Sequence, residues 1–422
     1  MADTAQGCGR TGSDATRSAG GARPAWLPPA AVAPDYGRLC TASIPDLVSA
    51  ALGLDGGRSP LVDAFDPPRV DRVLLVILDG LGQLRFDALC SADPAFPLGR
   101  LAARGTLGTV TTVFPSTTVA ALASYSTGVP PLTHGLLGYR LFLREISATV
   151  NMIQFGVVGG EREAPLPAGF DVERLMACST VYERLQDACV ATHVFLPRGI
   201  CDSGLSKLLY RGCETLHPCV GLSDALAASR AVLASSSGPT ALTLYWPGLD
   251  SIAHARGPES PSYEAEAAMI GSAIERELVG RVGRTLLVLS SDHGFVTMDP
   301  SDYAPLGLYP ELRDASRLFP TGEPRASYFH LRSGNGTALP WALPADVGEG
   351  LVLMESREAI ASGLFGAGAS HPESANRLGD LVLISTARRG LRHPYPDAPL
   401  LRGMHGGLSE EEMLVPLLVA LL

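Results

Sequence analysis

Continuous apolar runs of strand length recur along the chain, and segments of helical character separate them. The runs cover residues 73–78 (VLLVIL), 192–197 (THVFLP), 240–246 (TALTLYW) and 285–291 (TLLVLSS). Such runs are typical of strands that are buried on both faces of a parallel sheet. The clearest amphipathic helix covers residues 264–280, between two of these runs. The alternation predicts an α/β fold, doubly wound, in which helices flank both faces of a mainly parallel central sheet.

The pattern weakens at the amino terminus and in one internal segment. Residues 1–35 begin as a polar stretch rich in Gly, Ser and Ala, so we predict a disordered tail followed by one domain over residues 36–422.

Residues 141–153 alternate enough between apolar and polar positions for a strand or hairpin. Residues 300–375 hold many Gly and Pro, which predicts a small inserted cap. Residues 378–387 (LGDLVLISTA) are expected to resume the core sheet, and the last segment to form a helix or strand.

Composition narrows the class of protein. The chain has 422 residues, is 46% hydrophobic and carries a formal charge of -10, which suits a globular protein and argues against non-specific nucleic-acid binding. Its eight cysteines include no C-x-x-C pair, so a structural zinc knuckle is not expected. The amino terminus lacks the apolar core of a signal peptide, and no apolar run reaches the length of a membrane span. We expect a soluble cytoplasmic protein that does not bind membranes. Its oligomeric state is left open.

The stretch 111–128 (TTVFPSTTVAALASYSTG) has the character of a strand, a turn and a helix in succession. Pro115 would not be tolerated deep in a helix, and Ser116, Thr117 or Thr118 can cap one that starts here. Hydroxyl groups at this point lie at the positive end of a helix, which favours an approaching anion. A plain helix cap and an anion-binding nucleophile are both consistent with the stretch.

Three acidic residues follow apolar strands. Asp79 comes directly after residues 73–78, Asp250 shortly after residues 240–246, and Asp292 directly after residues 285–291. The carboxyl ends of parallel strands share one edge of a sheet, and ligands bind beyond that edge. A cluster of carboxylates repels itself and is costly to desolvate, so a bound cation is the simplest reason for one.

Histidines accompany these carboxylates. His254 lies four residues after Asp250, which places both on one face of a helix, and His293 follows Asp292. His405 lies in a glycine-flanked loop. Mixed carboxylate and imidazole ligands suit Zn²⁺, with Mn²⁺ or Fe as alternatives. The two predicted sites are Asp250, His254 and His405 for one divalent ion, and Asp79, Asp292 and His293 for the other, completed by Thr118.

The remaining histidines are assigned structural roles. His134 is expected to brace a turn near the site through a hydrogen bond. The others lack acidic partners at ligand spacing: His193, His217, His330, His371 and His393.

Taken together, the motifs resemble those of the alkaline phosphatase superfamily, and within it the type I phosphodiesterase/nucleotide pyrophosphatase family. The resemblance starts at about residue 70 and rests on motifs that follow one another in a fixed order: VILDGLG, FPSTTVAALASYSTG, PPLTHG, LDSIAHARGP, SSDHGF and MHGG. It implies an alkaline-phosphatase-like fold and the same two metal sites, normally zinc. By the family's spacing the nucleophile lies nine positions before Thr127, which is Thr118, with Thr117 as the alternative. The sulfatase signature C-x-P-S-R is absent.

One position departs from the family. Eukaryotic members have an asparagine that holds a phosphoryl oxygen shortly after the His-Gly turn, where this chain has Tyr139 and Arg140. Tyr139 could donate one hydrogen bond to the phosphate, and Arg140 could clamp it with two. The alternative is that Tyr139 packs under the cap and Arg140 pairs with an acid. The difference leaves the choice between monoester and diester open.

The sequence therefore predicts a two-metal phosphoester hydrolase of the phosphodiesterase/nucleotide pyrophosphatase type. Two ions about 4 Å apart would form a clamp for phosphoryl transfer, with a covalent phosphothreonine intermediate. The partner would be a small-molecule phosphoester such as a nucleotide. The alternatives are a phosphomonoesterase or phosphomutase of the same superfamily, and a non-catalytic metal-binding protein of this fold.

Overall fold

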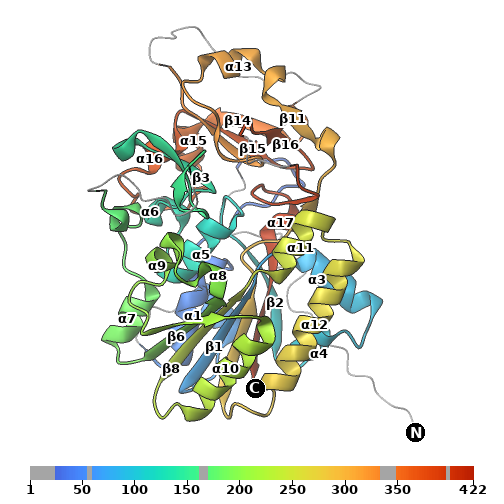
Figure 1. The fold of residues 1–422 in the computed structure, drawn as a ribbon. Helices are drawn as coiled ribbons and strands as arrows, with labels where there is room; N and C mark the ends of the chain where they lie inside the picture. Colours follow the sequence, from blue (N-terminus) through green and yellow to red (C-terminus); the bar gives the residue numbers. More distant parts are fainter. Residues whose placement is uncertain (1–23, 55–58, 161–169, 333–347, 396–399) are drawn as a thin grey trace.

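The computed structural model describes residues 24–54, 59–160, 170–332, 348–395 and 400–422. Two seven-stranded sheets organise the chain, a mainly parallel one in the lower half of Figure 1 and an antiparallel one in the upper half. None of the helices within the described ranges is both long and apolar enough to cross a membrane.

The central sheet has the strand order β2-β18-β9-β1-β8-β6-β7. Its strands are β1 (Arg72–Leu78), β2 (Thr106–Thr111), β6 (Ala191–Pro197), β7 (Thr215–Cys219), β8 (Thr240–Trp246), β9 (Thr285–Ser290) and β18 (Leu414–Leu421). The pairs from β9 through β1, β8 and β6 to β7 are parallel, and only β18 runs antiparallel to its neighbours β9 and β2. The four apolar runs are therefore confirmed as strands of a mainly parallel sheet.

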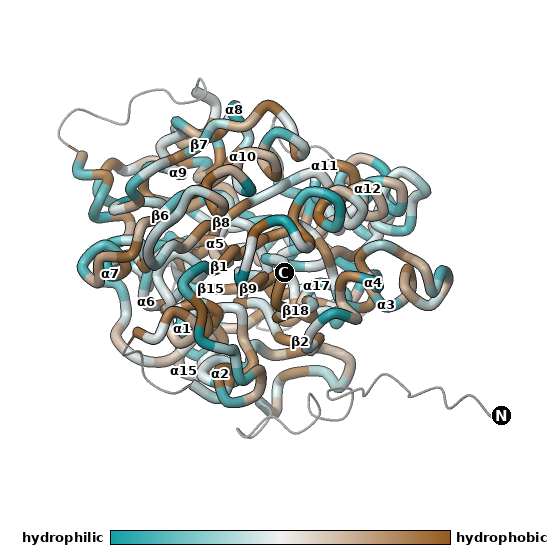
Figure 2. The backbone as a smooth tube through the Cα atoms, turned by 90° about the horizontal axis from the view of Figure 1, so that it is seen from below, coloured by the Kyte–Doolittle hydropathy of each residue, from teal (hydrophilic) through white to brown (hydrophobic). Residues whose placement is uncertain are grey.

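Helices cover both faces of this sheet, as the alternation predicted. One face packs against α3 (Gln83–Ala92), α4 (Pro97–Ala102), α10 (Leu222–Ser235), α11 (Gly248–Arg256) and α12 (Pro261–Leu278). The other packs against α1 (Ile44–Ala51), α5 (Thr118–Thr127), α7 (Val181–Asp187) and α9 (Gly204–Leu209). In β1, Leu74 and Val76 face the first group and Val73 and Leu75 the second, which explains the uninterrupted apolar run. Figure 2 shows the strands between α10, α11 and α12 on one side and α1 and α7 on the other.

The second sheet lies above the carboxyl ends of the central strands in Figure 1. Its order is β14-β15-β13-β12-β3-β4-β5, and all neighbouring strands in it pair antiparallel. The strands are β3 (Arg140–Leu143), β4 (Ala148–Asn151), β5 (Gly156–Val157), β12 (Thr321–Glu323), β13 (Ala326–Phe329), β14 (Leu351–Glu355) and β15 (Leu381–Ser385). Residues 141–153, predicted as a strand or hairpin, thus contain the antiparallel pair β3 and β4.

Short elements complete the chain. The helices are α2 (Pro60–Phe65), α6 (Pro131–His134), α8 (Arg198–Cys201), α13 (Pro310–Ala315), α15 (Ser356–Ala361), α16 (Ser374–Leu378) and α17 (Glu410–Met413). The two-stranded pairs are β10 (Val296–Thr297) with β17 (Gly403–Met404), and β11 (Tyr303–Pro305) with β16 (Gly390–Arg392).

The structure differs from two predictions about the second half of the chain. Residues 381–385 were expected in the core sheet but form β15 of the second sheet, because a fully buried apolar run looks the same whichever sheet buries it. The segment 300–375, expected as an inserted cap, shares its sheet with residues 140–157 and 381–385, so the second sheet is assembled from separate parts of the chain. Residues 333–347 of that segment lie outside the described residues.

The amino-terminal prediction is wrong in part. Residues 1–23 lie outside the described residues, but residues 24–35 pack on the body of the protein. Leu27 and Ala31 are buried, and the Val32 N–H donates to the carbonyl of Leu408 at 2.7 Å. Composition could not predict this, because the segment is held by backbone hydrogen bonds to a distant loop.

Candidate active site

The turn before α5 places its hydroxyl groups at the carboxyl edge of the central sheet. The helix begins at Thr118, and Thr117 is its N-cap residue but makes no side-chain capping bond. Ser116 does not cap the helix either, because its hydroxyl donates to the carbonyl of Gly407 at 2.8 Å. A plain helix cap therefore does not account for these side chains. Every residue of α5 is buried, which the small side chains of VAALAS allow.

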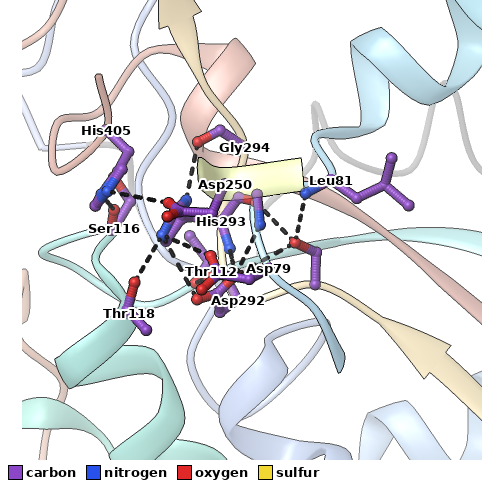
Figure 3. A network of polar contacts seen from close by, with 12 residues as sticks. Asp79, Leu81, Thr112, Ser116, Thr118, Asp250, Asp292, His293, Gly294 and His405 are labelled. Carbon is purple, nitrogen blue, oxygen red and sulfur yellow. Dashed lines mark hydrogen bonds and ion pairs between the residues drawn. The ribbon is translucent and has the colours of Figure 1, made fainter. Parts of the chain in front are cut away.

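One group of candidate ligands lies directly beneath Thr118. The Nε2 atom of His293 is 3.5 Å from Oδ1 of Asp79 and 3.5 Å from Oδ2 of Asp292. The hydroxyl oxygen of Thr118 lies 3.2 Å from the same nitrogen. Asp79, Asp292 and His293 are buried. The four residues predicted for this site are thus side by side (Figure 3).

The second predicted group is also assembled. The Nε2 atom of His254 is 3.3 Å from Oδ1 of Asp250 and 3.3 Å from Nε2 of His405, and the Asp250 oxygen is 3.8 Å from the latter nitrogen. Asp250 and His254 project from one face of α11, as their spacing predicted. The rings of His293 and His405 stack at a centroid distance of 3.7 Å, so the two groups adjoin.

Backbone carbonyls fix the same tautomer in all three rings. Nδ1 of His254 bonds to the carbonyl of Gly403 at 2.9 Å, that of His293 to Gly294 at 3.1 Å and that of His405 to Ser116 at 3.0 Å. A carbonyl can only accept, so each Nδ1 carries hydrogen. In the neutral rings Nε2 is then an acceptor, and all three Nε2 atoms face the carboxylates.

Three carboxylate oxygens in this cluster are buried without a hydrogen-bond partner. They are Oδ1 of Asp79, Oδ1 of Asp250 and Oδ2 of Asp292, the atoms nearest the histidines. A buried carboxylate oxygen without a donor is strongly unfavourable. Convergent carboxylate oxygens and imidazole nitrogens are the donor set of a divalent cation, and the residues fit such a group.

The electrostatics of the cluster agree with that fit. Burial and the charges of Asp250 and Asp292 raise the pKa of Asp79 well above its ordinary value. Burial alone would raise the pKa of Asp250, but His254 beside it lowers that pKa overall. Burial and the neighbouring His293 and His254 hold the pKa of His405 well below its ordinary value. Carboxylates are therefore held close to one another, and so are imidazoles, at a cost in free energy that a bound cation would offset.

Tyrosine hydroxyl groups hold the turns that carry the carboxylates. Tyr245 of β8 donates to Oδ2 of Asp79, which leaves Oδ1 facing His293. Tyr263 of α12 donates to the carbonyl of Gly80 at 2.8 Å, and Tyr125 of α5 donates to the carbonyl of Ser291 at 2.9 Å. All three tyrosines are buried.

Tyr139 and Arg140 reach the region from the second sheet. The Tyr139 hydroxyl accepts from Nδ2 of Asn151 at 2.8 Å. The guanidinium of Arg140 is buried and lies 4.6 Å and 4.8 Å from the ring centres of Tyr139 and Tyr395. Arg140 is paired across the sheet with Gly322, the residue before Glu323.

Glu323 is a candidate functional residue that the sequence analysis did not identify. Its side chain is buried, and Oε2 lies 3.7 Å from Nδ1 of His405. Burial raises the pKa of Glu323 to about 8, although Thr117, His254 and Arg140 lower it. No local signal marks this residue, because it follows a glycine in a short strand of the second sheet.

The structural histidines behave largely as expected. The Leu136 N–H donates to Nδ1 of His134 at 3.1 Å, and Nε2 of His134 lies 3.1 Å from the Ser124 hydroxyl, which is the predicted brace. Within the described ranges, groups of three or more candidate metal ligands form only at the cluster above. His193 and His217 contact each other at 3.1 Å.

Comparison with known proteins gives one family and a set of solved structures with a similar fold. A family model described as type I phosphodiesterase/nucleotide pyrophosphatase matches residues 73–407, well over half of the chain. No curated protein matches the sequence.

The solved structures with a similar fold include two different proteins. Murine ectonucleotide pyrophosphatase/phosphodiesterase 5, in an inactive threonine-to-alanine form in complex with AMP, has a TM-score of 0.63 at 16% identity over 82% of this chain and 87% of its own. Phosphonoacetate hydrolase from Sinorhizobium meliloti 1021, in complex with phosphonoformate, has a TM-score of 0.63 at 21% identity over 86% of this chain and 92% of its own. At these identities the likeness shows the alkaline-phosphatase-like fold.

Proposed function

The chain belongs to the type I phosphodiesterase/nucleotide pyrophosphatase family, and on that premise we propose that it is a two-metal phosphodiesterase or nucleotide pyrophosphatase with Thr118 as its nucleophile. The family and the fold support a phosphoester hydrolase. One observation carries the proposal for this chain. Three partnerless buried carboxylate oxygens converge with three imidazole nitrogens within reach of the Thr118 hydroxyl.

The donor groups divide into two sets. Asp250, His254 and His405 would hold one divalent ion, and Asp79, Asp292, His293 and Thr118 would hold the other. Zinc is the preferred ion because the set mixes imidazoles and carboxylates, with Mn²⁺ or Fe as alternatives. Such a pair of ions, when bound, lowers the pKa of a coordinated hydroxyl and stabilises negative charge on the transferring phosphoryl group.

The protein's own residues then carry out a two-step transfer. Oγ1 of Thr118 attacks phosphorus, the bond from phosphorus to the leaving oxygen breaks, and the hydroxyl proton passes through solvent to that oxygen. Water next attacks the phosphothreonine, which releases the phosphorylated product and restores the Thr118 hydroxyl. The position of Thr118 at the first residue of α5 presents its oxygen to the positive end of the helix.

Tyr139 and Arg140 are proposed to bind the phosphoryl oxygens that the ions leave exposed. Arg140 is held between two aromatic rings, and a guanidinium fixed in this way can donate two parallel hydrogen bonds. The Tyr139 hydroxyl accepts from Asn151, so its own hydrogen can point to a ligand.

The test is metal content together with hydrolysis of matched chromogenic esters. We expect about two zinc ions per chain and faster turnover of bis-p-nitrophenyl phosphate than of p-nitrophenyl phosphate, both lost on chelation and restored by zinc. AMP-containing diesters and phosphonoacetate belong in the same panel, because proteins of this fold include enzymes associated with these ligands. Faster monoester turnover would make the protein a phosphomonoesterase. Interconversion of phosphate positions without phosphate release would indicate a mutase, and metal binding without turnover a binding protein.

A further inference from the structure

We propose that the buried ion pair between Arg325 and Glu412 positions His405 for its metal, so that occupancy of this metal site depends on the second sheet. The inference rests on the proposed two-metal function, but neither residue is a metal ligand there. Arg325 lies between β12 and β13 of the second sheet, and Glu412 lies in α17, which leads into β18 of the central sheet.

The pair is bidentate and fully enclosed. Nε of Arg325 donates to Oε1 of Glu412 at 2.5 Å, and one terminal nitrogen donates to Oε2 at 2.6 Å. Both side chains are 0% exposed. The guanidinium also donates to the carbonyls of Ala387 and Arg389, which follow β15. Arg325 therefore ties Glu412 to two segments of the second sheet.

Glu412 passes this constraint to the loop that carries His405. Oε1 accepts the N–H of Gly407 at 2.9 Å, and Oε2 accepts the hydroxyl of Ser409 at 2.7 Å. Gly407 is two residues beyond His405, at most about 7 Å along the chain, so this contact limits where the backbone of His405 can lie. From the other side, the Ser116 hydroxyl accepts from Gly406 and donates to Gly407.

The loop is packed closely against the second sheet. Gly406 has a φ of 116°, which glycine adopts readily and other residues do not, and a Cβ on it would meet Oε2 of Glu323 at 2.6 Å. Outer contacts of this kind orient metal ligands, and their loss typically reduces metal affinity by about 10–100-fold. The contact to the second sheet should therefore matter for one metal and not for the other.

The experiment compares metal content in folded variants at a fixed free zinc concentration. Glu412→Gln keeps the shape of the side chain and removes the charge. Arg325→Met combined with Glu412→Met removes both charges together, which is often tolerated where a single unpaired charge is not. Arg377→Met is the matched control, because Arg377 is also fully buried and donates to the carbonyls of Gly135 and Leu175, away from the His405 loop.

We expect two zinc ions in the wild type and in Arg377→Met, and about one in Glu412→Gln and in the double variant, with a 10–100-fold lower affinity at one site. His405→Ala should lose the same ion, and Glu412→Gln added to His405→Ala should change nothing further, because both act on one site. A folded Glu412→Gln or double variant that binds two ions with wild-type affinity overturns the inference. A wild type that binds no metal instead overturns the proposed function.

Discussion

Thr118 and His293 meet across 175 residues of sequence, with the threonine hydroxyl 3.2 Å from Nε2 of the imidazole. The contact brings the first residue of α5 to the exit of β9. Thr117, the neighbouring hydroxyl, is buried and interacts with Glu323. The sequence favoured Thr118 as the nucleophile by spacing alone and kept Thr117 as the alternative. In the structure the two hydroxyl groups have different surroundings.

Substitution of the two threonines should distinguish them. Thr118→Ala is expected to lower kcat on bis-p-nitrophenyl phosphate by at least about a thousandfold, because the covalent route needs this oxygen. Thr118→Ser keeps a hydroxyl and should retain measurable turnover, and its acid-quenched protein should carry one phosphoryl group. Thr117→Ala is expected to stay within about tenfold of wild type. Full activity in Thr118→Ala, with loss in Thr117→Ala, would reverse the assignment.

Tyr245→Phe tests whether Asp79 needs the hydrogen bond from Tyr245 to bind its metal ion. Removal of one oxygen takes away the hydrogen bond to Oδ2 of Asp79 and should lower zinc affinity by about 10–100-fold at one of the two sites. Tyr182→Phe is the control, since its buried hydroxyl donates to Thr243 of the same strand as Tyr245. Isothermal titration calorimetry of the metal-free proteins with zinc measures the zinc affinity of both variants. Equal zinc affinity in the two variants would show that Asp79 is oriented without Tyr245.

The sequence was sufficient for those parts of the site that follow strands of the central sheet. Asp79 and Asp292 could be placed together because a buried apolar run identifies a strand, and parallel strands end at one edge. His254 could be placed beside Asp250 because four residues make one helical turn. These inferences need only local periodicity and one rule of topology.

Glu323 and Arg325 could not be predicted, because they reach the site through pairing of distant segments. Strand β12 is three residues long and joins β3 through a single pair, Gly322 with Arg140. Nothing in so short a run identifies its partner. Glu412 did carry a readable signal, since Ser409 and Glu412 form a capping box, but this predicts the start of a helix and not an ion pair with the second sheet.

Metal removal should reveal the strain in the carboxylate cluster. We expect chelation to lower the thermal midpoint of the wild type, because zinc binds only the folded state. Asp79→Asn should raise the midpoint of the metal-free protein, because it removes a carboxyl group whose pKa burial and the charges of Asp250 and Asp292 raise, and a raised carboxyl pKa costs stability at neutral pH. The same variant should gain less than the wild type when zinc is added. Differential scanning calorimetry with and without zinc measures the four thermal midpoints. A metal-free Asp79→Asn variant with a lower midpoint than the metal-free wild type would contradict the prediction.

Buried histidines outside the ligand groups should make the fold sensitive to acid. Burial lowers the pKa of His134 and of His393 to about 3. Between pH 6.5 and 3 the unfolded chain binds these protons and the folded chain does not, so stability falls as pH decreases. Each such histidine contributes up to about 1.4 kcal/mol per pH unit. Urea unfolding of the metal-free protein from pH 7 to 4.5 should follow this slope.

His134→Gln separates this effect from the general loss of packing. The substitution removes a titrating group that is held by Ser124 and Leu136, so it should lower stability at pH 7 yet flatten the dependence on pH by about one proton. Ser229→Ala, which removes a buried hydroxyl bonded to Ala225 on α10, should lower stability without changing the slope. If both variants kept the wild-type slope, His134 would have to be protonated in the folded state, and its Nδ1 could not then accept the Leu136 N–H.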